Sequence, residues 1–179
     1  MYPAGSAMAP LDATITTLGT PSVSVSRTEF RTYETATITV EGSGFDPVAA
    51  TGTRPPLSGK PSGAYVVFGK FAENWRPSQS APSSTRVNTS QKWAVLAGDM
   101  AAIGGPGAGA IELKPDGTFT AEITVSKAAI DAVATAENLV NYGIYTYAGS
   151  GATNAGYETY TPITFSDPTG SVTVSKTEF

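Results

Sequence analysis

The sequence predicts an all-β protein, built as an antiparallel sandwich of seven strands with long loops and one short helix. Threonine, serine, glycine and proline are abundant and leucine is rare, a mixture that favours strands and turns over helices. Apolar residues, 40% of the chain, alternate with polar ones in short segments separated by turn residues. A different antiparallel barrel would fit the same pattern.

The first half of the chain contains three strand patterns. Val23 and Val25 alternate with serines in the first strand. In the second, residues 35–40, every other side chain is apolar, and two glycines just after it indicate a bulge or a tight turn. The third, residues 64–71, is a nearly continuous apolar run, which predicts a central strand.

Long loops are predicted around the third strand. Residues 48–63 and 72–92 are rich in proline and polar side chains, and residues 98–109 are rich in glycine and alanine. A short strand over residues 93–96 separates the last two loops.

A strand, a turn and a second strand are predicted over residues 110–125. The turn is Lys114-Pro115-Asp116-Gly117, where proline presets φ and glycine accepts a positive φ. Two carboxylates of this segment, Glu112 and Glu122, would face each other across such a hairpin.

One helix and two further strands complete the predicted elements. Ser126 is placed to cap a helix over residues 127–140. Its apolar face would consist of Ile130, Val133 and Val140. The strands cover residues 141–147 and 157–165, and Pro162 indicates an edge or a bulge in the last one.

Nine residues near the start recur almost unchanged further on. Ser22 to Phe30 and Ser171 to Phe179 are identical at seven of nine positions, 149 residues apart, which is about one domain length. We therefore expect a domain over residues 22–168. Residues 169–179 would be the first strand of a next repeat, and residues 1–21 a linker, a tail or artificial sequence.

The duplicated strand predicts a way for neighbouring copies to associate. An unpaired strand has free backbone donors and acceptors, so the second copy would join a neighbour's sheet in place of the first, head to tail. The apolar residues involved would be Val23, Val25, Phe30, Val172, Val174 and Phe179. The alternative is a tail that is disordered or lies on its own domain.

Composition excludes several kinds of site. The net charge of −4 and the scattered lysines and arginines argue against a nucleic-acid partner. Without cysteine or histidine there are no disulfides, thiol nucleophiles, imidazole bases or usual zinc ligands, and no cofactor is predicted. No apolar stretch approaches the length of a membrane span, and residues 1–10 lack the features of a signal peptide.

Several segments resemble bacterial domain families. Val23 to Ser26 followed by Thr37 to Pro47 resembles the start of neocarzinostatin-like domains of actinobacteria, as does Asp116 to Phe119. Phe68 to Ser78 and Tyr142 to Tyr147 are similar to immunoglobulin-like modules of actinobacterial surface proteins, some of which also carry haem-uptake domains of the HtaA type. The resemblance implies a seven-strand immunoglobulin-like sandwich. It brings neither the enediyne cleft nor haem binding, because cysteine and histidine are absent.

Two groups of aromatic residues are candidates for recognition. Tyrosines gather in the last two strands, where Tyr145, Tyr147 and Tyr157 would bind a planar ligand or a partner, or would pack across strands. Trp75 and Arg76, with Trp93, would anchor a carbohydrate or peptide, or would fix a long loop to the sheet.

No catalytic motif stands out. Glu29 with Glu34, and the hairpin pair above, are the only carboxylate pairs considered for glycoside hydrolysis, and no serine elbow exists. Asp46 and Asp116 are candidate calcium ligands, although neither lies in the sequence pattern of a known calcium-binding loop. A crosslink from Lys70 to an asparagine is a further alternative to simple exposure of that amine.

The sequence therefore predicts a non-catalytic structural, adhesive or assembly module of a repetitive bacterial protein, secreted or attached to the cell wall. Its partners would be a protein, a cell surface or neighbouring copies of itself. A small-ligand carrier that binds beside the tyrosine-rich sheet is the alternative.

Overall fold

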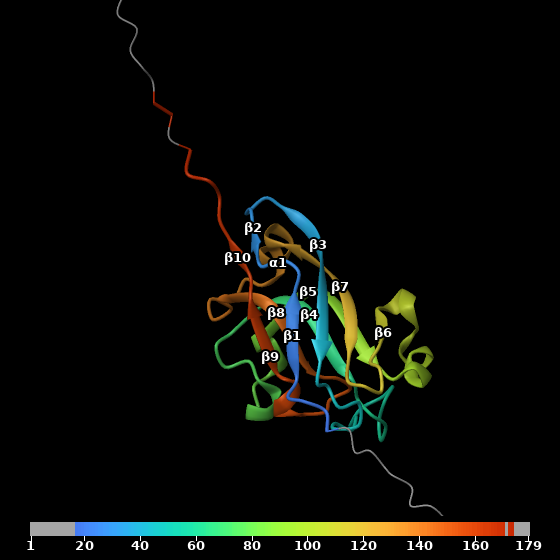
Figure 1. Ribbon diagram of the computed structural model, residues 1–179. Coiled ribbons are helices and arrows are strands. Elements are labelled where there is room, and N and C mark those ends of the chain that lie inside the picture. The colour runs from blue at the N-terminus through green and yellow to red at the C-terminus, as the bar shows by residue number, and fades with distance from the viewer. Residues whose placement is uncertain (1–16, 171, 174–179) are drawn as a thin grey trace, which may run out of the picture.

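The computed structural model describes residues 17–170, 172 and 173 (Figure 1). Within these residues the regular structure is mostly β-strand, with one α-helix, α1 (Lys127–Val133), and several short 3₁₀ turns. The predicted all-β class is therefore confirmed. None of the helices in this described part is long and apolar enough to cross a membrane.

The strands form two large sheets and one small one. A three-stranded antiparallel sheet has the order β1 (Ser22–Val25), β3 (Thr35–Ser43), β7 (Phe119–Ser126). A five-stranded sheet has the order β6 (Ala110–Glu112), β5 (Arg86–Val95), β4 (Ala64–Phe71), β8 (Asn141–Ala148), β9 (Thr159–Pro162). The short strands β2 (Glu29–Phe30) and β10 (Thr164–Phe165) pair in parallel.

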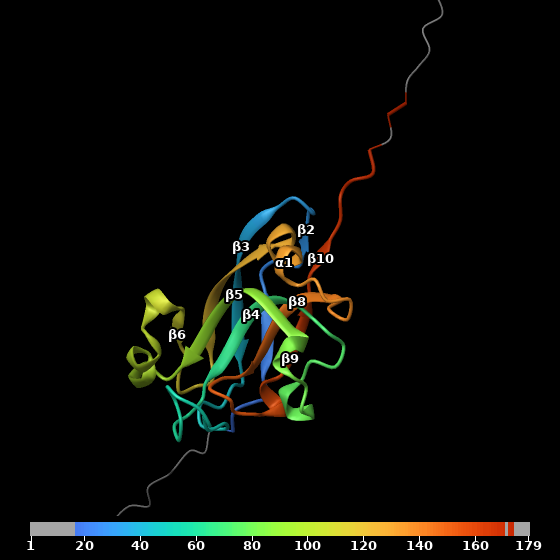
Figure 2. The ribbon, with the colours of Figure 1, turned by 180° about the vertical axis from the view of Figure 1, so that it is seen from behind.

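The main core lies between the two large sheets (Figures 1 and 2). Ile38 and Ile123 of the three-stranded sheet belong to the same buried cluster as Val66, Phe68 and Ile144 of the five-stranded sheet. Side chains of this size each contribute about 1.5–3 kcal/mol when fully buried. Strands β3, β4 and β8 thus each place one face in a shared core.

The loop predicted over residues 72–92 is wrong in its second part. Strand β5 begins at Arg86 and pairs with β4 from Arg86 to Ala94, with one irregularity opposite Phe68 and Gly69. Most of its side chains before Ala94 stay partly or fully exposed, and they are largely polar. The strand is held by backbone pairing with β4 rather than by side-chain burial. Its sequence therefore lacks the alternation of apolar and polar residues by which strands are predicted.

The predicted turn at residues 114–117 forms, but the predicted hairpin does not. Gly117 has a φ of +80°, and the Asp116 carboxylate accepts a hydrogen bond from the Thr118 amide at 3.0 Å. However, β6 pairs in parallel with β5, while β7 pairs with β3. The turn carries the chain from one sheet to the other, and turn chemistry alone does not choose a strand's partner.

The helix begins as predicted and ends early. The Ser126 hydroxyl accepts a hydrogen bond from the Ala129 amide at 3.3 Å, as a cap does. Ile130 is buried, but Val133 and Val140 are 56% and 51% exposed, contrary to the predicted apolar face. Leu139, which follows the end of the helix, is buried in the main core. The core is therefore covered here by the chain after α1 and not by a longer helix.

The last predicted strand is divided into two. Strand β9 pairs with β8 at the outer edge of its sheet, as Pro162 indicated, whereas β10 pairs with β2. Strand β2 was not predicted either, and the described residues contain ten strands, so a sandwich of seven strands is not confirmed.

Candidate functional site

The outer face of the five-stranded sheet carries a group of aromatic side chains, here called the aromatic face. Odd-numbered residues of β4 and β8 point away from the core, and the register sets Tyr65 opposite Tyr147 and Tyr145 opposite Tyr160. The aromatic face consists of Tyr65, Phe71, Trp75, Trp93, Tyr145, Tyr147 and Tyr160.

Much of the aromatic face is packed against itself. The rings of Phe71 and Tyr145 stack with centroids 3.8 Å apart, and Trp75 packs edge-on against both, at 5.6 and 5.0 Å. Trp75 comes from the loop between β4 and β5 and is only 3% exposed. This tryptophan therefore fixes the loop onto the sheet. Burial raises the pKa of the Tyr145 hydroxyl well above its usual range.

The six residues proposed for recognition do not form one exposed surface. Trp75 and Tyr145 are buried in the aromatic face, and Tyr157 is buried in the main core against Phe45, with centroids 5.5 Å apart. Burial raises the pKa of the Tyr157 hydroxyl to about 12. The residues that remain partly exposed are Arg76, Trp93 and Tyr147.

A pocket of about 350 Å³ lies at one end of the aromatic face, beside Tyr65 and Tyr147. Arg86, the first residue of β5, contributes to its wall. The guanidinium of Arg86 donates hydrogen bonds to the carbonyls of Trp75 and Ala81, at 2.8 and 3.1 Å, and lies 5.4 Å from the centre of the Tyr147 ring. This arginine is therefore held in place by the same loop that Trp75 fixes.

Arg54 also forms part of the wall of the pocket. The amides of Thr53 and Arg54 donate to the carbonyl of Ser150, at 2.9 and 3.0 Å, and the Ser150 amide donates to the Tyr65 hydroxyl at 3.3 Å. Gly151 has a φ of +74°, and a Cβ there would lie 2.6 Å from Nε of Arg54. Glycine is thus required for Arg54 to lie against this backbone. Sequence reasoning did not single out Tyr65, Arg54 or Arg86.

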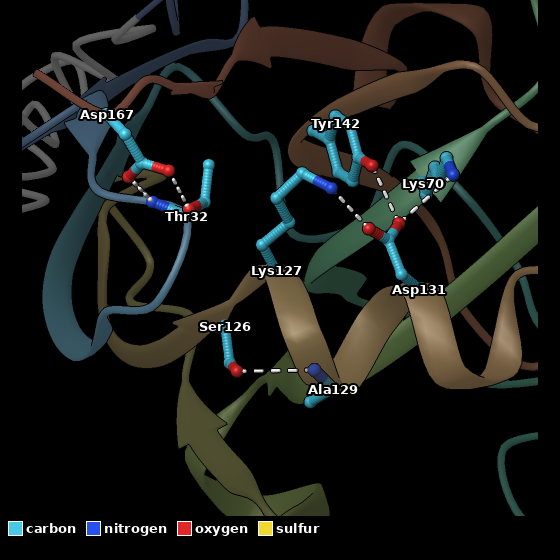
Figure 3. A network of polar contacts seen from close by, with 8 residues as sticks. All are labelled: Thr32, Lys70, Ser126, Lys127, Ala129, Asp131, Tyr142 and Asp167. Carbon is cyan, nitrogen blue, oxygen red and sulfur yellow. Dashed lines mark hydrogen bonds and ion pairs between the residues drawn. The ribbon is translucent and has the colours of Figure 1, made fainter. Parts of the chain in front are cut away.

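A second polar cluster joins the helix to the five-stranded sheet (Figure 3). The carboxylate of Asp131 accepts hydrogen bonds from the amines of Lys70 and Lys127, at 3.0 and 2.5 Å, and from the Tyr142 hydroxyl at 2.6 Å. Burial opposes ionisation of Asp131, but hydrogen bonds from these three donors outweigh it and lower its pKa to about 2. Burial also lowers the pKa of Lys70, and the bonds to Asp131 and Tyr142 reverse this to a net rise.

These pKa shifts bear on the Lys70 crosslink considered from the sequence. Attack of the Lys70 amine on an asparagine side chain, with release of ammonia, needs the uncharged amine, whereas the raised pKa of Lys70 favours its charged form. Lys70 is therefore held as an ion pair, with its side chain 18% exposed.

Neither pair of carboxylates named from the sequence forms a catalytic pair. The members of one pair lie in different sheets, and one member of the other pair is bound to an arginine. Glu112 lies on β6 and Glu122 on β7, in different sheets, so they do not face each other across a hairpin. Glu34 forms a two-point ion pair with Arg27. Within residues 17–170 no three histidine, cysteine or acidic side chains are grouped so as to hold a metal ion.

The proposed strand-exchange residues lie at two places in the fold. Val23 and Val25 are partly buried in the edge strand β1, and Phe30 is buried in β2. Val172 is 87% exposed. Val174 and Phe179 lie outside the described residues.

The segment after β10 is attached to the domain. The Ser166 amide donates to the Phe30 carbonyl at 3.0 Å. The Asp167 carboxylate accepts hydrogen bonds from the amide of Thr32, at 3.0 Å, and from its hydroxyl (Figure 3). These bonds hold the chain to the turn between β2 and β3 as far as residue 167.

Comparisons with models of protein families, with curated proteins and with solved structures found no match for this chain.

Proposed function

We propose that the chain is a non-catalytic structural module, repeated end to end in a protein of the bacterial cell surface. The observation that carries this proposal is the position of its two ends. Residues 17–21 leave the domain at one pole and residues 166–170 at the opposite pole, as Figures 1 and 2 both show. Because Ser22–Phe30 recurs at Ser171–Phe179, a next repeat would start at the far pole and extend the chain in a line.

The junction between such repeats would be short. Asp167 is hydrogen-bonded to Thr32 of its own domain, which leaves residues 168–170 before the next copy of β1. Three residues span at most about 11 Å when extended. Pro168 removes further freedom from this linker. The repeats would therefore form a semi-rigid rod, suited to spacing, adhesion or assembly.

The strand order supports an immunoglobulin-like fold within this proposal. Strands β1, β3 and β7 correspond to one sheet of that sandwich, and β5, β4, β8 and β9 to the other. Strand β2 leaves the first sheet to pair with β10, beside the second. The resemblance of the sequence to actinobacterial surface modules is the basis on which we propose a secreted or wall-associated location.

The alternative, a small-ligand carrier, receives less support. A carrier needs a largely enclosed apolar pocket beside the tyrosine-rich sheet. On the aromatic face that position is filled by Trp75, which packs on Phe71 and Tyr145.

A protein containing residues 22–170 twice in tandem tests the proposal. Small-angle X-ray scattering should give a maximum dimension close to twice that of one domain, because the linker joins opposite poles. The Asp167→Ala variant should broaden the distance distribution, because it frees the linker from Thr32. A maximum dimension near that of one domain, with the repeats side by side, would contradict the proposal.

A further inference from the structure

We propose that the pocket between Arg54, Arg86, Tyr65 and Tyr147, here called the arginine pocket, binds the carboxylate of an acidic sugar. This is a recognition site on the surface of the module, and it does not depend on how the modules are joined.

Charge is the first argument. The protein has a net charge of −4, so its overall field does not attract anions. Yet two of its five arginines line one pocket. No carboxylate lines the arginine pocket, and within the described ranges neither Arg54 nor Arg86 forms a salt bridge. Two guanidinium groups without an acidic partner are the expected receptor for a carboxylate, which they bind through paired hydrogen bonds.

The second argument is that the pocket is built in advance. Arg86 is held by the carbonyls of Trp75 and Ala81, and Arg54 belongs to a loop whose backbone is bonded to Ser150. A left-handed glycine, Gly151, makes room for the Arg54 side chain. The Arg86 side chain and the backbone that carries Arg54 are thus fixed before binding, which reduces the entropy lost when a ligand arrives.

The remaining lining residues indicate a sugar. Tyr65 and Tyr147 meet at an angle of 64°, with centroids 5.3 Å apart, and both are partly exposed. Their rings offer flat apolar surface to a sugar ring, and Thr53 and Thr153 add hydroxyl groups to the wall. The volume of about 350 Å³ is near the lower end of the range of about 300–1,000 Å³ for ligand pockets. One charged sugar unit, exposed on one side, fits this description better than a large apolar ligand.

Fluorescence titration of the whole chain with sodium glucuronate tests the inference. Trp93 packs on Tyr65, with centroids 4.9 Å apart, so its emission should report a ligand on that ring. Glucuronate should give a saturable change, and glucose should give none at the same concentration and ionic strength. Arg54→Gln should weaken glucuronate binding about tenfold or more, since it removes a charge-assisted hydrogen bond.

Arg31→Gln is the matched control, because it removes the same charge from an exposed arginine outside the arginine pocket. It should leave binding unchanged, and both variants should unfold at the wild-type urea concentration. Equal binding of glucuronate by wild type and Arg54→Gln would overturn the proposal, as would equal binding of glucose or the absence of any binding. Tighter binding of benzoate than of glucuronate would overturn the assignment to a sugar.

Discussion

At the scale of single residues, Asp131 holds more of the fold together than its partly exposed position indicates. Its carboxylate accepts from donors on three elements: Lys70 of β4, Lys127 of α1 and Tyr142 of β8. Both amines also lie near the Tyr142 ring, 5.0 and 5.3 Å from its centre. Loss of the carboxylate would leave two positive charges close together without the group that compensates them.

We therefore predict that Asp131→Asn destabilises the protein by about 1 kcal/mol at neutral pH, a figure reduced for solvent screening. The pKa of Asp131 is lowered to about 2 in the folded protein, below its value of about 3.9 in an unfolded chain. The contribution of Asp131 to the free energy of unfolding is thus complete above its pKa in the unfolded chain. It is lost as the pH falls through its pKa in the folded protein.

Urea unfolding at a series of pH values measures this contribution. The difference between wild type and Asp131→Asn should be constant from pH 7 to about pH 5 and should shrink towards pH 2. Glu73→Gln, at an exposed position, is the control and should show little difference at any pH. A difference for Asp131→Asn that grows as the pH falls would contradict the assigned direction of the pKa shift.

At the scale of elements, the sequence predicts best where local chemistry decides the structure. Strand β4 has its predicted limits, Ser126 caps α1, and the turn at Gly117 has a positive φ, because apolar burial, capping and turn geometry are properties of a few adjacent residues. Residues 86–92 of strand β5 were predicted to be a loop, because this part of the strand is largely polar and is held mainly by backbone pairing with β4. The sequence also predicted the wrong partner for β6, which pairs with β5 and not with β7. The partner depends on which sheet the chain enters after the turn, and local sequence does not determine this.

The same limit applies to the candidate sites. The tyrosines of β8 were recognised from sequence, but the burial of Tyr145 depends on a loop tryptophan that closes over it. Arg54 and Arg86 are 32 positions apart and line one pocket because Ser150 holds the backbone of Arg54 and the loop carrying Trp75 holds Arg86. No periodicity within either segment contains that information.

The loop between β4 and β5 gives a prediction at this scale. Trp75→Ala should destabilise the protein by about 3–5 kcal/mol, because it removes a buried tryptophan that packs edge-on against the stacked rings of Phe71 and Tyr145. It should also speed proteolytic cleavage within residues 76–85, since Trp75 fixes that loop. Tyr33→Ala, at a position 78% exposed, is the control and should change stability by less than about 0.5 kcal/mol. A similar small effect for Trp75→Ala would show that the loop is held by its other contacts.

At the scale of the whole molecule, the duplicated strand raises the question of exchange between copies. Strand β1 is an edge strand of four residues that pairs only with β3. Its two valines are partly buried and pack against the main core. A second copy of this strand, with Val172 and Val174, would offer nearly the same contacts in the same register.

Exchange therefore gains almost nothing in contact energy. A neighbour's segment that replaces β1 would form similar bonds to β3 but would add the cost of association, about 4–15 kcal/mol in lost freedom. The chain's own β1 also competes at an effective concentration in the millimolar range, because it is covalently attached. We expect β1 to stay in its own domain, so that repeats join through covalent linkage.

Light scattering of the full chain and of a variant lacking residues 170–179 measures this balance. Both proteins should be monomers at high protein concentration, the full chain with a mass near 18.4 kDa. A larger mass for the full chain, lost when the segment is deleted, would show that strand exchange prevails. In that case Val25→Asp, which weakens β1 at a partly buried position, should increase the mass further, because it favours replacement by the neighbour's segment. If the mass of the full chain does not depend on the segment, the duplicated strand acts only within a continuous series of repeats.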